Sequence, residues 1–306
     1  MKLVLLAIAA VLTACQHLPP RDYQAETGVA FVEVGEGRIG YLADGNPSAP
    51  LVILMHGFPD SPHTWDSTRE LLAESGFYAV SPFMKGYAPS DVPVEGFDLI
   101  TRGRETLALI DALEAEQAVI VGHDWGASQA YAAASLNPDR VEKLVAVGIP
   151  HPAARAGCAP CIAFRGRHFL NLKQRRAHLR VARNDFAYVD RMYRRWAGQP
   201  IPPGHTEPVQ NALSAPGSLQ SALGYYRDSS LCVPNELKGQ IPVPTLAFAG
   251  TEDILPVKMY EAAQTFFSGE YEVVVMDGVG HFPHLEASES FHDELLRFLK
   301  EDSPGK

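Results

Sequence analysis

The stretch VGHDWGAS, residues 121–128, decides the fold class of this chain. The apolar run that leads into it, AVIVGHD, is typical of a strand, and the small-residue segment that follows, GASQAYAAASLN, is typical of a helix. Between the two, Gly122 and Gly126 flank Asp124 in the pattern G-x-D-x-G. A strand, a tight glycine-flanked turn and a helix form the nucleophile elbow, whose central side chain is held above the end of a sheet. We therefore expect Asp124 to act as a nucleophile.

The carboxylate at the tip of this turn restricts the chemistry. A serine that attacked an sp³ carbon would leave an ether, which water does not readily cleave. A carboxylate leaves an ester instead, which a water molecule activated by histidine can cleave. Asp124 is ionised near neutral pH and needs no base to deprotonate it. The turn therefore favours epoxides or alkyl halides as substrates and disfavours ordinary esters.

The rest of the chain supplies the sheet that such a turn requires. Short apolar runs alternate with helical patterns on both sides of the turn, at PLVILMHG, YAVSPF, VPTLAFAG and YEVVVMDG. This alternation predicts a mostly parallel sheet covered by helices on both faces. From residue 151 to 240 the strand-like runs vanish and helical segments remain. We therefore expect a core formed by residues 28–150 and 241–306, with a helical cap at 151–240 inserted between them.

Three other segments supply candidate partners for the nucleophile. The segment HGFPDS, residues 56–61, stands where such folds build an oxyanion hole from backbone N–H groups, and we assign that role to Phe58 and Trp125. Asp253 in GTEDILP and His281 in GVGHFPHLE each follow a predicted strand. Glu252 competes with Asp253 for the role of the orienting acid. The order nucleophile, acid, base along the chain is that of the α/β-hydrolase fold.

With HGFPDSPHTW, GHDWG, GTED and GHFPHLE in this order, the chain resembles the epoxide hydrolases of the α/β-hydrolase fold over about residues 28–300. The resemblance implies an eight-stranded, mostly parallel sheet and opening of an epoxide to a vicinal diol through an aspartyl ester. A haloalkane or haloacid dehalogenase is the alternative, because haloalkane dehalogenases share the elbow aspartate; they typically carry Asn where this chain has Phe58. A catalytically idle, surface-anchored binding protein is a third possibility.

The resemblance also implies donors in the cap that protonate the epoxide oxygen. The segment GYYRDS matches the motif for one tyrosine donor and places it at Tyr226, unless Tyr225 and Tyr226 are both core residues of a cap helix. The second tyrosine of the family is missing from RGRHFLNLKQ, where His168 or Phe169 takes its place. His168 is the candidate second donor, and an exposed helical histidine is the alternative.

The N-terminus predicts export. An apolar run from Leu3 to Leu12 is too short to span a bilayer and fits a secretory signal. The sequence Leu-Thr-Ala-Cys at residues 12–15 resembles a lipoprotein box, which implies lipidation of Cys15; ordinary signal cleavage is the alternative. Residues 1–15 would then be the signal and 16–27 a tether. Gln16 implies an outer-membrane anchor, with the domain facing the periplasm or the cell surface.

Composition excludes some other functions. The net charge of −10 argues against nucleic acid, and one basic patch, KQRRAHLRVARND, interrupts the acidic background. No motif indicates a metal, a nucleotide or a flavin, so we expect a small-molecule substrate and no cofactor. Cys158, Cys161 and Cys232 are expected to be structural, with their pairing left open.

Overall fold

The structure is a computed structural model, and it describes residues 21–154, 167–230 and 232–301 of the 306-residue chain. The predicted signal segment, Cys15, Cys158 and Cys161 lie outside these residues. Cys232 lies within them, is exposed and forms no disulfide.

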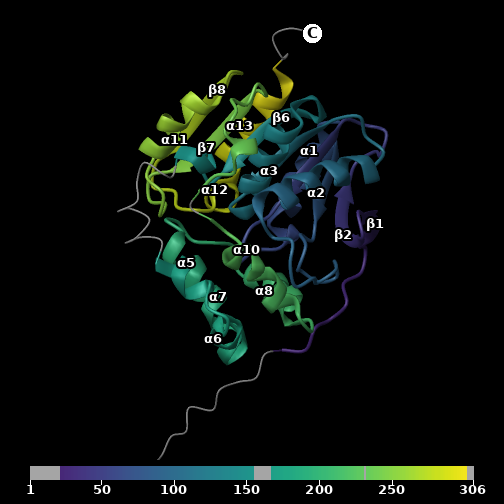
Figure 1. Cartoon of the computed structure of the whole chain (residues 1–306), viewed down its shortest axis with the longest axis vertical. Coiled ribbons are helices and arrows are strands. Elements are labelled where there is room, and N and C mark those ends of the chain that lie inside the picture. Colours follow the sequence, from purple (N-terminus) through teal and green to yellow (C-terminus); the bar gives the residue numbers. More distant parts are fainter. Residues whose placement is uncertain (1–20, 155–166, 231, 302–306) are drawn as a thin grey trace, which may run out of the picture.

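An eight-stranded sheet forms the centre of the molecule (Figure 1). Its spatial order is β1-β2-β4-β3-β5-β6-β7-β8. Strand β2 is antiparallel to both of its neighbours, and all other pairs are parallel. The predicted α/β-hydrolase fold class is confirmed. The strands are β1 (Ala30–Val34), β2 (Gly37–Asp44), β3 (Leu51–Met55), β4 (Tyr78–Pro82), β5 (Ala118–His123), β6 (Val141–Val147), β7 (Thr245–Gly250) and β8 (Tyr271–Met276).

Helices cover both faces of the sheet because its central strands are apolar on both sides. In β3 the side chains of Ile53 and Met55 join the core beneath α2 and α3, whereas Val52 and Leu54 join the core beneath α1 and α13. The core helices are α1 (Asp66–Glu74), α2 (Leu99–Ala112), α3 (Trp125–Leu136), α11 (Lys258–Ala263), α12 (Pro283–Glu286) and α13 (Ser288–Lys300), with short 3₁₀ turns η1 (Pro62–Trp65), η2 (Pro138–Arg140), η4 (Asn235–Leu237) and η5 (Gln264–Phe266).

The inserted region between β6 and β7 is helical and lies over one end of the sheet (Figure 1). No strand occurs among the described residues of this insertion. Its helices are α5 (Arg167–Leu172), α6 (Ala177–Val181), α7 (Arg183–Trp196), α8 (Thr206–Ser214), α9 (Ser218–Ala222) and α10 (Gly224–Arg227). We call this helical region the cap.

The first described residues, 21–26, lie against the cap, and we call them the strap. The Arg21 guanidinium pairs with Asp185 of α7 at 2.7 Å. Gln24 exchanges two backbone hydrogen bonds with the side chain of Asn211 in α8. Glu26 pairs with His63 of the core at 2.8 Å. The segment predicted as a tether therefore has, in its described part, fixed contacts with both cap and core.

Among the described helices, none combines the length and the apolar composition that crossing a membrane requires.

Candidate active site

Asp124 ends strand β5 and precedes helix α3, at the predicted elbow. Its backbone has φ 52° and ψ −113°, a conformation that a non-glycine residue adopts only where the surroundings hold it. The neighbouring positions must be small. A Cβ on Gly57 would collide with the Asp124 side chain, and one on Gly126 would collide with the carbonyl oxygen of Met55. Glycine at positions 57 and 126 therefore permits the close packing that projects the Asp124 carboxylate.

Each oxygen of the Asp124 carboxylate has its own neighbour. The backbone N–H of Phe58 donates to Oδ1 at 3.0 Å, and His281 Nε2 lies 3.5 Å from Oδ2. Burial alone would raise the pKa of Asp124, but the hydrogen bond and charge of His281 outweigh it and hold that pKa below its ordinary value. The side chain remains 13 % exposed, so the ionised carboxylate is accessible to a substrate. The Phe58–Pro59 peptide is cis.

His281 is oriented by Asp253. Asp253 follows β7 and His281 follows β8, and the ring Nδ1 lies 3.0 Å and 3.1 Å from the two carboxylate oxygens. Burial opposes a charge on this ring, yet Asp253 and Asp124 together raise the pKa of His281 to about 10. Glu252 is exposed, whereas Asp253 is buried. The structure therefore places Asp253, and not Glu252, against the histidine.

Tyr226 of helix α10 lies beside the residues that surround Asp124. Its ring makes edge contacts with Phe58 and Trp125, at centroid distances of 5.4 Å and 5.1 Å. Burial, followed by the charge of Asp124, raises the pKa of Tyr226 well above its ordinary value. Tyr225 turns elsewhere, and its hydroxyl donates to the carbonyl oxygen of Lys85 at 3.2 Å. Only one of the two adjacent tyrosines therefore faces the site.

His168 and Phe169, at the place of the missing second tyrosine, both lie close to Tyr226. The Phe169 ring is 5.0 Å from Tyr226 and 5.5 Å from Trp125, whereas the His168 ring is 6.4 Å from Tyr226. His168 is buried and packs on Trp196 at 4.7 Å, so it is not an exposed helical histidine. Both residues border the site, and the Phe169 ring lies closer to the Tyr226 ring than the His168 ring does.

A second buried cluster lies directly behind His281. We call Asp60, His123 and His284 the rear cluster. The His123 ring is 4.9 Å from the His281 ring, and its Nε2 donates to the His281 carbonyl oxygen at 2.9 Å. His284 Nε2 bonds to the Thr64 hydroxyl at 2.6 Å. Both histidines are buried, and each forms a hydrogen bond within the protein.

Asp60 connects the rear cluster to the cap. His205, which precedes α8, lies 3.3 Å from its Oδ1, and the Tyr193 hydroxyl lies 3.1 Å from His205. Although burial opposes its charge, the hydrogen bond and charge of His205 hold the pKa of Asp60 well below its usual range. Sequence reasoning missed this contact. The signal was a carboxylate directly after His-Gly-Phe-Pro, but its partner lies 145 residues further along the chain.

The rear cluster does not have the spacing of a zinc site. Its potential ligand atoms lie within 4.8 Å of one another, and Asp60 Oδ2 is 3.9 Å from His123 Nδ1. Four zinc bonds of about 2.0–2.1 Å in a tetrahedron would place the ligand atoms about 3.3 Å apart. We therefore interpret the cluster as buried polar packing.

Arg102 is a second residue that sequence reasoning missed. It lies buried on α2, with its guanidinium 5.1 Å from the Trp125 ring and 4.9 Å from the Tyr225 ring. A cation at this distance is attracted to the faces of both rings. The sequence feature that could have identified it is an arginine on the apolar side of a predicted helix, whereas Arg104, two residues later, is exposed. Arg102 therefore stabilises the positions of Trp125, which follows Asp124, and Tyr225, which precedes Tyr226.

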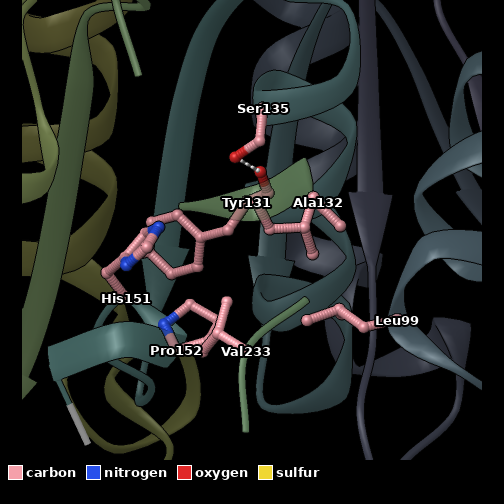
Figure 2. Close-up of a pocket in the computed structure, with 8 residues that line it drawn as sticks. Leu99, Tyr131, Ala132, Ser135, His151, Pro152 and Val233 are labelled. Carbon is pink, nitrogen blue, oxygen red and sulfur yellow. Dashed lines mark hydrogen bonds between the residues drawn. The ribbon is translucent and has the colours of Figure 1, made fainter. Parts of the chain in front are cut away.

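A separate hollow lies beyond α3 and leaves no room for a water molecule (Figure 2). Tyr131, His151 and Leu237 contribute to its lining. His151 is buried and stacks on Phe266 at 4.8 Å. It is therefore not a surface residue, because the aromatic side chains of this region enclose it.

Known proteins resemble the chain along most of its length. A model described as the alpha/beta hydrolase family matches residues 52–294. Epoxide hydrolase A of Mycobacterium tuberculosis is 30% identical over 88% of this chain and 96% of that protein. The crystal structure of epoxide hydrolase A from Mycobacterium thermoresistibile has a TM-score of 0.74 at 25% identity, covering 89% of this chain and 98% of that one. The Bacillus megaterium epoxide hydrolase shares the fold, with a TM-score of 0.79 at 18% identity over 89% of this chain and 100% of that one.

Proposed function

The chain belongs to the epoxide hydrolases of the alpha/beta hydrolase family, and we propose that it opens an epoxide to a vicinal diol through an ester on Asp124. One observation carries the proposal. The two oxygens of the nucleophile already differ, because Oδ1 accepts the Phe58 N–H and Oδ2 faces His281. Oδ1 is therefore the future oxyanion and Oδ2 the attacking atom.

In the first step Oδ2 attacks an epoxide carbon and the carbon–oxygen bond of the ring breaks. The electron pair of that bond goes to the departing oxygen, which takes the Tyr226 hydroxyl proton. A buried tyrosine beside an anion resists ionisation, so it gives up its proton only to a strong base such as the new alkoxide. His168 is the proposed second donor. The products are an ester on Asp124 and a free hydroxyl group.

In the second step water attacks the ester carbonyl carbon while His281 Nε2 accepts a proton. The ester has removed one of the two negative charges that raise the pKa of His281, so the ring can now lose its proton. The proton that His281 loses after the ester has formed returns to the Tyr226 oxygen through solvent, and the neutral ring can then accept a proton from water. The Phe58 and Trp125 N–H groups would stabilise the charge on Oδ1. Collapse breaks the bond between Oδ2 and the carbonyl carbon, and the departing Oδ2 takes the proton of the new carboxyl group. The diol leaves with Oδ2, Asp124 is again a carboxylate, and His281 is again protonated.

The first test is intact-protein mass spectrometry of His281→Gln incubated with epoxides and alkyl halides. Without the base the ester should accumulate, and an adduct with the mass of the whole epoxide should map to Asp124. His284→Gln is the matched control, because it changes a buried histidine three residues away and should leave ester hydrolysis intact. An adduct that carries only the alkyl group of a halide would assign the chain to dehalogenation. Absence of any adduct would contradict the aspartyl ester.

Oxygen labelling gives an independent check of the second step. In a single turnover in H₂¹⁸O, the first diol should carry no label and Asp124 should gain one ¹⁸O. Label in the first diol would mean that water attacks the epoxide directly, and the ester route would then be wrong.

Dehalogenation is the second candidate because of Trp125. Its buried indole nitrogen lies beside the Tyr226 hydroxyl, and its N–H could instead be donated to a halide. Phe58, however, offers no side-chain donor beside it. Quenching of tryptophan fluorescence by chloride or bromide would favour this candidate.

We also infer that the protein is exported and lipidated at Cys15, as a lipoprotein facing the periplasm or the cell surface. The support is the sequence alone, Leu3 to Cys15. Detergent extraction followed by mass spectrometry should find acyl chains on Cys15, and Cys15→Ser should release the protein from membranes. A water-extracted wild-type protein without acyl chains would contradict the anchor.

A further inference from the structure

The cap carries a charge opposite to that of the rest of the protein. Residues 167–195 contain nine lysine and arginine residues and two aspartates, a formal charge of +7. The whole chain has a net charge of −10, so the remainder has −17. Such segregation within one chain creates a local field that attracts anionic surfaces.

Two exposed leucines accompany these charges. Leu170 of α5 is 69 % exposed and Leu179 of α6 is 58 % exposed. Arg175 and Arg176, in the turn that joins these helices, are also exposed. We call these four residues the basic cap face. Apolar side chains next to arginines suit the boundary between lipid headgroups and acyl chains, where both parts find a favourable environment.

The strap brings the N-terminal chain to the same region. Arg21 is fixed to Asp185 of α7 through two side-chain hydrogen bonds, and a third comes from its backbone N–H. Helix α6 lies at the end of the cap that is remote from the sheet, and Asp185 belongs to the start of α7, which follows α6 (Figure 1). Five residues separate Cys15 from Arg21, and the six steps of an extended chain between them span at most about 20 Å. An anchor at Cys15 would therefore hold this end of the cap near the bilayer.

We propose that the basic cap face docks on a bilayer containing anionic phospholipid. The charge and the exposed leucines carry this proposal by themselves, whereas the orientation of the chain on the bilayer also rests on the proposed anchor. Lipid is favoured over nucleic acid because the exposed apolar residues of the face are leucines, and aromatic rings are the side chains on which bases stack. The attraction extends over about 10 Å at moderate salt.

The test places a fluorescent reporter on the face. The chain has three tryptophans, Trp65, Trp125 and Trp196, and all are buried, so Leu179→Trp adds the one exposed indole. Val275→Trp on β8 is the matched control, at a residue that is 48 % exposed on the edge strand of the sheet. Each full-length variant is incorporated into vesicles of phosphatidylethanolamine and phosphatidylglycerol that contain brominated acyl chains. Bromine quenches an indole only at close contact.

The Leu179→Trp emission should be strongly quenched, and the Val275→Trp emission should match the wild-type background. Adding Arg175→Ala and Arg176→Ala should lower the ratio of docked to undocked protein about 30-fold, the effect of two arginines at an anionic surface. Replacing phosphatidylglycerol with neutral phosphatidylcholine should also reduce the quenching. Epoxide turnover should not change in these variants.

Equal quenching at both positions, quenching that ignores the arginines, or no quenching at Leu179→Trp would each overturn the proposal. A Leu179→Trp signal that responds to an oligonucleotide and not to vesicles would reassign the face to nucleic acid. If Cys15 carries no acyl chain but Leu179→Trp is quenched, the docking surface stands and the anchor fails.

Discussion

Two buried histidine–aspartate clusters lie back to back in this protein, and their chemistry differs. In the catalytic cluster, His281 lies between Asp253 and Asp124, and these charges raise its pKa to about 10. In the rear cluster, burial and the charge of His281 lower the pKa of His123 to about 4. The two rings are only 4.9 Å apart.

The difference comes from hydrogen bonding. His281 directs both ring nitrogens at carboxylates, so a proton on each nitrogen has an acceptor. His123 uses Nε2 as a donor to a carbonyl oxygen, which leaves Nδ1 of the neutral ring as an acceptor, 3.9 Å from Asp60. His123 Nδ1 and the Asp60 carboxylate are then both acceptors, so no hydrogen bond forms between them. A buried histidine beside an aspartate is therefore charged only when the geometry gives its second proton a partner.

The largest expected effect separates the two aspartates. Asp124→Asn removes the nucleophile, and kcat/KM should fall by about 10⁴-fold or more. Asp60→Asn is the matched change in the rear cluster, and kcat/KM should stay within about tenfold, since Asp60 bonds to Ser61 and His205 rather than to the substrate. Its free energy of unfolding should fall by about 1–3 kcal/mol, because a buried hydrogen-bonding group loses its charge. Steady-state kinetics and urea unfolding measure both quantities.

Equal losses of activity in these two variants would break the comparison. Asp60 would then belong to the catalytic machinery.

The second-largest effect is expected at the two adjacent tyrosines, of which only Tyr226 faces the catalytic cluster. Tyr226→Phe should slow ester formation by about 10²-fold, because the alkoxide loses a proton donor. Tyr225→Phe loses only its hydrogen bond to Lys85 and should cost about 1 kcal/mol of stability without slowing the chemistry. Rapid-quench detection of the ester follows the rate. A larger effect at Tyr225 would mean that the donor is assigned to the wrong tyrosine.

A smaller effect is expected at the second donor position. His168→Phe should slow ester formation by about tenfold if His168 shares the protonation of the epoxide oxygen. Phe169→Tyr is the complementary variant, because it places a hydroxyl on the ring next to Trp125 and Tyr226. A faster Phe169→Tyr enzyme with an unaffected His168→Phe enzyme would show that position 169 is the place of the missing donor.

The smallest effect concerns stability and pH. His281 has a raised pKa, so its contribution to the free energy of unfolding is complete below about pH 6.5 and is lost as pH rises toward 10. His123 has a lowered pKa, so its contribution is present above about pH 6.5 and is lost as pH falls through about 4. Each limb has a slope of up to about 1.4 kcal/mol per pH unit for one proton. Urea unfolding from pH 4 to 10 should show a maximum between the limbs.

Single variants identify each limb. His281→Gln should flatten the alkaline side, and His123→Gln should flatten part of the acid side. Unchanged limbs in both variants would assign the pH dependence to other groups.

The sequence predicted the catalytic cluster more completely than the cap. Asp124, Asp253 and His281 each follow a strand of one parallel sheet, and the carboxyl ends of parallel strands meet at a single edge. The order of three motifs was therefore enough to predict their meeting. In the cap, α10 has four residues and α5 has six, and such short helices leave the direction of each side chain undetermined. Sequence periodicity could not separate Tyr225 from Tyr226, or His168 from Phe169.

By itself the sequence determined the fold class and predicted Asp124 as the nucleophile, because glycine spacing and strand-to-helix alternation are local properties of the chain. Only the tertiary structure decided that Asp60 meets His205, that Arg102 supports Trp125, and that one histidine is charged while its neighbour is neutral. These outcomes depend on distances between residues far apart in the chain. The energy of a buried charge changes with each ångström to its partner, and no sequence pattern encodes that distance.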